Sequence, residues 1–306
     1  MLSFLLRRVA TALPVLAGVA IAVFLLIHLV PGDPAVSMLG EGASPADVAA
    51  LRERLGLDRP LPEQFIRYTA RLMQGDMGQS FRYGTPVTKE IASRLGFTIL
   101  LAGCALTVAL TIAFPLGVLA AVFRGRPADV ALSLCALVGV SLPAFWLGPL
   151  LALVFAVRLG WLPVSGAGSV AHLVLPSLTL GTSLAAVLAR LVRSSVSDEL
   201  AELYVVAARA RGASSMRAVG HAVRNSLIPI VTIIGLQVGA VLTGSIVTET
   251  IFAWPGVGRL LVQAIGFRDY PLVQGCILFV ALVYVVVNLL TDVVYGWLDP
   301  RVRVVS

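Results

Sequence analysis

Charged residues are scarce in this 306-residue chain. They make up 13% of it, against roughly 25% in an ordinary soluble domain. Hydrophobic residues make up 58%, and the mean hydropathy is +0.94. A single water-soluble core is not expected from this composition, so the scarcity of charge indicates a chain that is solvated largely by lipid.

Residues suited to metal binding or nucleophilic catalysis are also few and scattered. Cys104, Cys135 and Cys276 all fall inside apolar runs, where unpaired thiols behave as small hydrophobes. The three histidines lie far apart, and no Gly-x-Ser-x-Gly nucleophile elbow occurs. We therefore expect no catalytic residue, no metal site and no bound cofactor in this chain.

Lysine is almost absent, because Lys89 is the only one. A phosphate-binding P-loop ends in Gly-Lys-Ser or Gly-Lys-Thr, whereas Lys89 lies in Thr88-Lys89-Glu90. The chain cannot supply that motif, so any ATP-driven work must be done by a partner.

Long apolar runs, in contrast, are abundant. A helix needs about 20 apolar residues to cross a hydrocarbon core of about 30 Å. These runs do not alternate in polarity as barrel strands would. Six spans are predicted, at 9–30, 98–122, 130–157, 172–191, 229–250 and 273–294. The predicted fold class is an all-α polytopic membrane protein, with the first run interpreted as an uncleaved helix rather than a signal peptide.

The arginines predict which side each connection faces. Twelve of them lie at the N-terminus, in 123–129, around 192–228 and in 295–306, against three in the opposite short loops. Cytoplasmic loops carry such an excess, so both termini and the 192–228 loop are predicted to be cytoplasmic. The same asymmetry accounts for the net charge of +7, which makes a nucleic-acid partner unnecessary.

The segment 31–97 is then extracytoplasmic. It carries eight basic and eight acidic residues, and its length exempts it from the charge rule. Amphipathic stretches at 48–55 and 64–73 predict a small folded or membrane-hugging subdomain rather than a flexible linker. The predicted organisation is an N-terminal helix (1–30), this segment, a five-helix core (98–294) and a cytoplasmic tail (295–306).

The 192–228 loop is predicted to form a helical hairpin in the cytoplasm. Ser195 and Asp198 resemble a capping box that would start one helix, and Gly212 would end it in a left-handed turn. Ser214 or Ser215 would cap a second helix that runs to Pro229.

The first helix of this hairpin offers a surface of low relief that another protein could approach closely, with arginines as polar anchors. The predicted docking residues are Ala207, Ala208, Arg209, Ala210, Arg211, Gly212 and Met216. The pattern alone leaves two interpretations open, docking of a partner or packing of the hairpin on its own membrane domain.

The sequence Ala-Ala-Arg-Ala-Arg-Gly at 207–212, followed by Arg-Asn-Ser-Leu-Ile-Pro at 224–229, resembles the loop by which permease subunits of bacterial ATP-binding-cassette (ABC) importers engage their ATPases. Further motifs resemble the dipeptide, oligopeptide, glutathione and nickel importer branch. In order they are Pro31-Gly32-Asp33-Pro34, Leu55-Gly56-Leu57-Asp58, Gly75-Asp76-Met77-Gly78, Ser141-Leu142-Pro143-Ala144-Phe145, Gly160-Trp161-Leu162-Pro163, Phe252-Ala253-Trp254-Pro255-Gly256-Val257-Gly258 and Leu298-Asp299-Pro300-Arg301.

This resemblance implies a type I ABC importer permease fold in the bacterial cytoplasmic (inner) membrane. It implies a non-catalytic subunit that forms half of a translocation path with a second homologous permease. Two ATPase subunits would use ATP and magnesium, and an extracytoplasmic binding protein would deliver the substrate. Membrane lipid is also an expected partner.

The substrate expected from the resemblance is a dipeptide or oligopeptide, with glutathione or chelated nickel as alternatives. A self-contained secondary carrier is the alternative of a different class. Such a carrier would normally show paired broken helices or repeated halves, and neither is evident in the sequence.

Two ionisable residues fall inside predicted spans, where burial in hydrocarbon is costly. Glu249 lies near the outer end of its span and Asp292 near the inner end of the last one. Each is expected either to line the translocation path or to pair with another helix.

Overall fold

The computed structural model describes residues 2–29, 33–40 and 42–298. In these residues all the regular secondary structure is helical, apart from one isolated bridge between Gln79 and Pro86. The elements are α1 (Leu2–Leu29), α2 (Pro34–Leu39), α3 (Pro45–Leu55), α4 (Leu61–Met73), α5 (Val87–Val122), α6 (Pro127–Ser141), α7 (Ala144–Leu151), a π-helical segment (Ala152–Arg158), α8 (Ala171–Ala201), α9 (Leu203–Ala210), α10 (Ser215–Ile251), α11 (Val257–Gly266) and α12 (Tyr270–Leu298). The all-α class predicted from run length is confirmed.

Five helices of the described chain are long and apolar enough to cross a membrane: α1, α5, α8, α10 and α12. A bent pair, α6 with α7 and the π-helical segment, makes the number six if it counts as one span. The prediction of about six spans is therefore confirmed. The motif residues Pro31 and Gly32, the motif 299–301 and most of the predicted tail 295–306 lie outside the described residues.

The third predicted span, 130–157, is not one straight helix. Its two halves are bent by 93° at the Leu142-Pro143 step, where α6 has ended and α7 begins. Pro143 has no N–H to donate, and its ring disfavours helical geometry at Leu142, whose φ and ψ are −92° and 110°. Apolar run length could not reveal this break.

The centre of the bundle is the contact between α5 and α8. Small residues recur every fourth position along α5, at Ala105, Ala109 and Ala113, and all three are fully buried. On α8, a Cβ added to Gly181 would lie 2.7 Å from the backbone oxygen of Ala105. The two helices therefore approach as closely as backbones allow, which is how helices associate within lipid.

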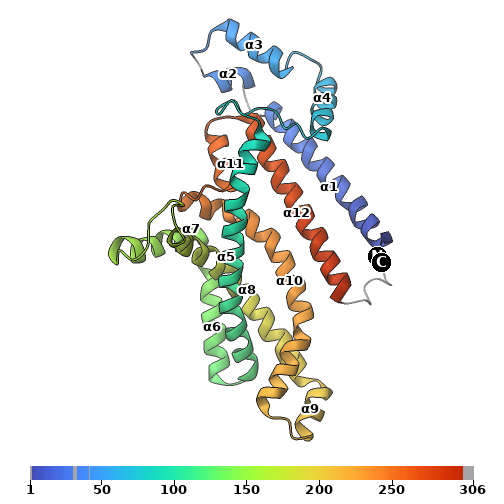
Figure 1. Cartoon of the computed structure of the whole chain (residues 1–306), viewed down its shortest axis with the longest axis vertical. Helices are drawn as coiled ribbons and strands as arrows, with labels where there is room; N and C mark the ends of the chain where they lie inside the picture. The colour runs from blue at the N-terminus through green and yellow to red at the C-terminus, as the bar shows by residue number, and fades with distance from the viewer. Residues whose placement is uncertain (1, 30–32, 41, 299–306) are drawn as a thin grey trace.

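The other helices pack around this pair. α6 and α7 pack against α8, and α10 contacts both α8 and α5. α12 packs on α10, and α1 packs mainly on α12 at the margin of the bundle (Figure 1). Gln274 of α12 donates to the carbonyl of Val23 in α1 over 2.8 Å.

The segment predicted to be a subdomain forms three short helices at one end of the molecule, opposite the end that carries α9 (Figure 1). Ser44 caps α3 by accepting from Asp47 N–H, and Arg52 of α3 pairs with Asp33 at the start of α2. The hydrogen bond from Arg52 lowers the pKa of Asp33. α4 rests on α1, where the Phe65 ring meets that of Phe24 at 5.2 Å.

We expect Gly181→Ala to destabilise the folded protein by about 1–3 kcal/mol, because the added methyl group has no space against the α5 backbone. Gly103→Ala is the matched control, since Gly103 also lies in a long helix but has nothing within 4 Å of its added Cβ. Thermal unfolding of both variants in detergent measures the difference. Equal stability of the two would contradict the close α5–α8 contact.

Candidate functional site

The predicted docking residues lie on and beside α9, at the end of the molecule farthest from α2–α4 (Figure 1). α9 is an eight-residue helix that joins α8 to α10. Glu202, whose backbone angles are extended, follows the last residue of α8 and precedes the first residue of α9. The predicted docking residues are therefore attached directly to two long helices, without a linker.

The predicted hairpin differs from the structure in two respects. No helix starts at Ser195, because α8 continues without a break from Ala171 to Ala201. No span starts at Pro229 either, because α10 runs through it from Ser215 to Ile251. Pro115 and Pro176 lie inside α5 and α8 in the same way, since the freed backbone groups of membrane helices find other partners.

The turn after α9 has the predicted form. Gly212 is left-handed, with φ of 89°. Ala213 N–H donates to the carbonyl of Ala208 and Gly212 N–H donates to that of Arg209, the paired bonds of a Schellman motif. The Ser214 hydroxyl then accepts from Arg217 N–H at the start of α10. Local chemistry alone thus closes α9 and opens α10.

Most of the predicted docking residues are exposed, and Ala208 is half-buried. Two apolar side chains of α9 that were not among the predicted docking residues are exposed as well. Leu203 is 82% exposed and Val206 is 55% exposed, and the predicted Met216 is 85% exposed. Large apolar side chains exposed on a short helix outside the membrane spans are a common feature of protein interaction sites. The signal that could have found Leu203 is its place at the start of a short helix outside the predicted spans.

The other side of α9 is held to the bundle. Val205 is fully buried, and the Tyr204 hydroxyl donates to the Glu199 carboxylate of α8 over 2.6 Å. Burial and this carboxylate raise the pKa of Tyr204. α9 therefore has one anchored face and one open face.

Behind α9, two polar contacts join α8 to the α5–α6 turn. Arg193 of α8 forms a two-pronged ion pair with Asp129 of α6, with N–O distances of 2.6 and 2.8 Å. Arg124 donates to the Ser197 hydroxyl over 2.9 Å. These contacts hold the end of α8 near α9 in a fixed position, and no pattern in the sequence predicts the pairing.

Glu249, expected to line the path or to pair with a helix, is fully buried against the start of α11. Its carboxylate accepts from the Thr98 hydroxyl of α5 over 2.8 Å and from Arg259 N–H in the first turn of α11 over 3.0 Å. Thr98 in turn accepts from Val257 N–H. Negative charge is favoured at a helix N-terminus, so this carboxylate fastens α11 to α5 and α10.

The motif 252–258, which contains Trp254, lies at this contact between α5, α10 and α11. The Trp254 ring N–H donates to the Phe97 carbonyl of α5 over 2.9 Å. Gly256 lies directly against the Glu249 carboxylate, which leaves no space for a Cβ. Asp292, the other intramembrane acid, pairs with Arg8 of α1 at 3.0 Å.

Comparisons with known proteins place these features in a family. The model of the family described as "Binding-protein-dependent transport system inner membrane component" matches residues 113–304. The model of the N-terminal part of such membrane components matches residues 1–102.

Relatives of known name match over almost the whole chain. The glutathione transport system permease protein GsiC of Salmonella paratyphi A is 46% identical over 304 residues, which cover 99% of each chain. The protein of the same name from Escherichia coli K12 is 45% identical with the same coverage.

A solved structure resembles the fold. A crystal structure of an amino acid ABC transporter with histidines aligns with a TM-score of 0.52 and 16% identity, over 70% of this chain and 94% of that one. At this identity the likeness concerns the fold alone.

We expect Thr98→Val to lower the free energy of unfolding by about 1–3 kcal/mol, because it leaves Glu249 and Val257 N–H each without one buried partner. Thr107→Val is the matched control, since the Thr107 hydroxyl bonds only to a carbonyl of its own helix and the side chain is exposed. Thermal unfolding in detergent compares the two. A change no larger in Thr98→Val than in the control would contradict the role of this junction.

Proposed function

Since this chain belongs to the family of binding-protein-dependent transport system inner membrane components, as a non-catalytic permease subunit of an ABC importer, we propose that the substrate it carries is glutathione. What supports the proposal is that relatives named as glutathione permeases match at 45–46% identity over 99% of both chains. The general peptide expectation is refined rather than abandoned, because glutathione is itself a small peptide.

We further propose that the chain works with a second permease subunit, two ATPases and an extracytoplasmic binding protein, as the dependence of the family on a binding protein suggests. The open face of α9 is the surface proposed to contact an ATPase. This proposal depends chiefly on one observation, that Leu203 and Val206 of α9 and Met216 at the start of α10 are exposed at the end of the molecule predicted to be cytoplasmic.

The proposed mechanism follows from how α9 is attached. An ATPase that changes conformation on binding ATP can shift the permease only through a difference in contact energy between its two states. A displacement of α9 would pass directly into α8 and α10, because only Glu202 and the 211–214 turn separate these helices from it. The path would then switch between inward-facing and outward-facing forms without any chemistry in this chain.

Reconstitution with the neighbouring subunits tests the substrate. In proteoliposomes that contain ATP, we expect glutathione uptake that requires the binding protein and exceeds uptake of simple dipeptides and of chelated nickel. Uptake of a dipeptide at a higher rate than glutathione would contradict the proposed substrate. Uptake driven by an ion gradient without ATP would instead indicate a secondary carrier.

Gly212→Val tests the coupling role of α9. A β-branched residue in the left-handed region costs about 1–3 kcal/mol, so the turn should reshape and ATP hydrolysis should no longer drive uptake. Gly220→Val is the matched control, because neither glycine has any atom within 4 Å of an added Cβ, but Gly220 has ordinary helical angles.

The measurement is ATP hydrolysed per glutathione molecule imported, with the yield of folded protein recorded for each variant. We expect at least a ten-fold rise in this ratio for Gly212→Val alone. Unchanged coupling in Gly212→Val at full yield would overturn the proposed role of α9.

A further inference from the structure

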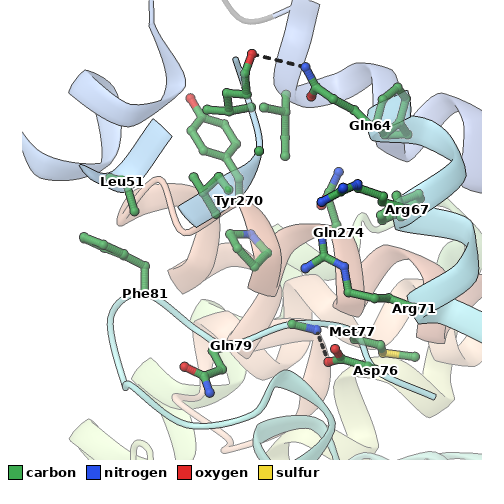
Figure 2. A pocket seen from close by; sticks show the side chains of 18 of the residues that line it. Leu51, Gln64, Arg67, Arg71, Asp76, Met77, Gln79, Phe81, Tyr270 and Gln274 are labelled. Atoms are coloured by element: carbon green, nitrogen blue, oxygen red, sulfur yellow. Dashed lines mark hydrogen bonds between the residues drawn. The ribbon is translucent and has the colours of Figure 1, made fainter. Parts of the chain in front are cut away.

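A cavity of about 560 Å³ opens between the outer end of α1, helices α3 and α4, the 76–84 loop and the start of α12 (Figure 2). Most of its lining comes from the segment 51–84, and only the ends of α1 and α12 contribute. This volume is within the range of sites that take small molecules. The cavity belongs to the part of the chain predicted to face the outside, where a substrate arrives.

The charged side chains that line the cavity carry an excess of positive charge. Three arginines line it, Arg59, Arg67 and Arg71, against two carboxylates, Glu53 and Asp76. Burial raises the pKa of the Tyr68 phenol in the same wall to about 12, so this group adds no negative charge.

Arg67 and Arg71 are one helical turn apart on α4, and Figure 2 shows both side chains reaching from α4 toward Gln274 of α12. Arg59 and Arg67 each pair with Glu63. Arg71 has no acidic partner among the residues that the structure describes. The cavity thus presents one guanidinium that forms no ion pair with a carboxylate of the described chain.

The carboxylate of Asp76 can bind a positive group of a ligand. Figure 2 shows Asp76 below Arg71 near the floor of the cavity. One oxygen of Asp76 accepts from Gly78 N–H over 2.8 Å, which fixes the carboxylate and leaves its second oxygen available. The aromatic side chains of Phe24, Phe81 and Tyr270 also line the cavity.

We propose that this cavity is a second binding site for the transported peptide, in which Arg71 and Arg67 hold a carboxylate group and Asp76 receives an ammonium group. A guanidinium binds a carboxylate through two parallel hydrogen bonds, which gives strength and orientation. A small peptide carries both a carboxylate and an ammonium group, and glutathione carries two carboxylates. The site lies on the permease itself, separate from the binding protein.

This inference rests on the proposed function for the choice of ligand. A soluble ligand is favoured over a phospholipid headgroup, because α3, α4 and the 76–84 loop form most of the wall and the membrane-spanning helices supply only their ends. The phospholipid therefore enters as an outcome of the test.

The test measures equilibrium binding of radiolabelled glutathione to the detergent-solubilised complex that copurifies with this chain, without the binding protein. We expect saturable binding that Arg71→Gln weakens at least ten-fold. Arg67→Gln should weaken it less, since Arg67 already shares Glu63. Glutathione dimethyl ester, which has no carboxylates, should compete poorly.

Lys89→Gln is the matched control. It removes one positive charge from the same outer region, but Lys89 is exposed and does not line the cavity. Binding by this variant should equal that of the wild type. Arg71 is itself exposed, so its replacement should leave the yield and elution of the complex unchanged, which is checked in the same preparation.

Three results would overturn the inference. They are absence of saturable binding, equal binding by Arg71→Gln and the wild type, and recovery of a phospholipid that depends on Arg71 and that glutathione does not displace. The proposed function is judged separately, by uptake with the binding protein present. A complex that imports glutathione but fails to bind it alone would refute the second site and leave the proposed function standing.

Discussion

The close contact between α5 and α8 is the constraint on which the rest of the bundle depends. Lipid is as apolar as the side chains it meets, so helices in a membrane gain little from hiding apolar surface and associate through tight packing instead. Alanines on α5 and Gly181 on α8 allow that packing. The helices that contact α8, including α6, α7 and α10, take their positions from this pair.

Polar contacts then fix the two ends of the packed pair. Near α9, the Asp129–Arg193 ion pair ties α6 to α8. At the other end of the bundle, Glu249 ties α10 and α11 to Thr98 of α5. Each buried charge has its partners in place, as burial requires. The interior between the two ends is held by shape, so the polar contacts limit which helices can move apart.

The sequence predicts correctly those features that depend only on neighbouring residues or on the length of an apolar run. Run length gives the spans because the thickness of the membrane sets it. Gly212 and Ser214 were identified because a left-handed turn and a helix cap each need only neighbouring residues. The Ser195 cap and the Pro229 boundary were wrong, because packing within a long membrane helix overrides such local signals. The contact of Thr98 with Glu249 joins residues 151 positions apart, and no local pattern around either residue predicts that the other is its partner.

The continuity of α10 through Pro229 has a mechanical meaning. A helix of 37 residues is about 55 Å long, so α10 runs without a break from the Ser214 cap beside α9 to the Glu249 junction with α11. A tilt of about 5° around one end of a rod of this length moves the other end by about 5 Å. Under the proposed mechanism, a displacement of α9 would be carried along this unbroken helix to the α11 end without any intervening step of local unfolding.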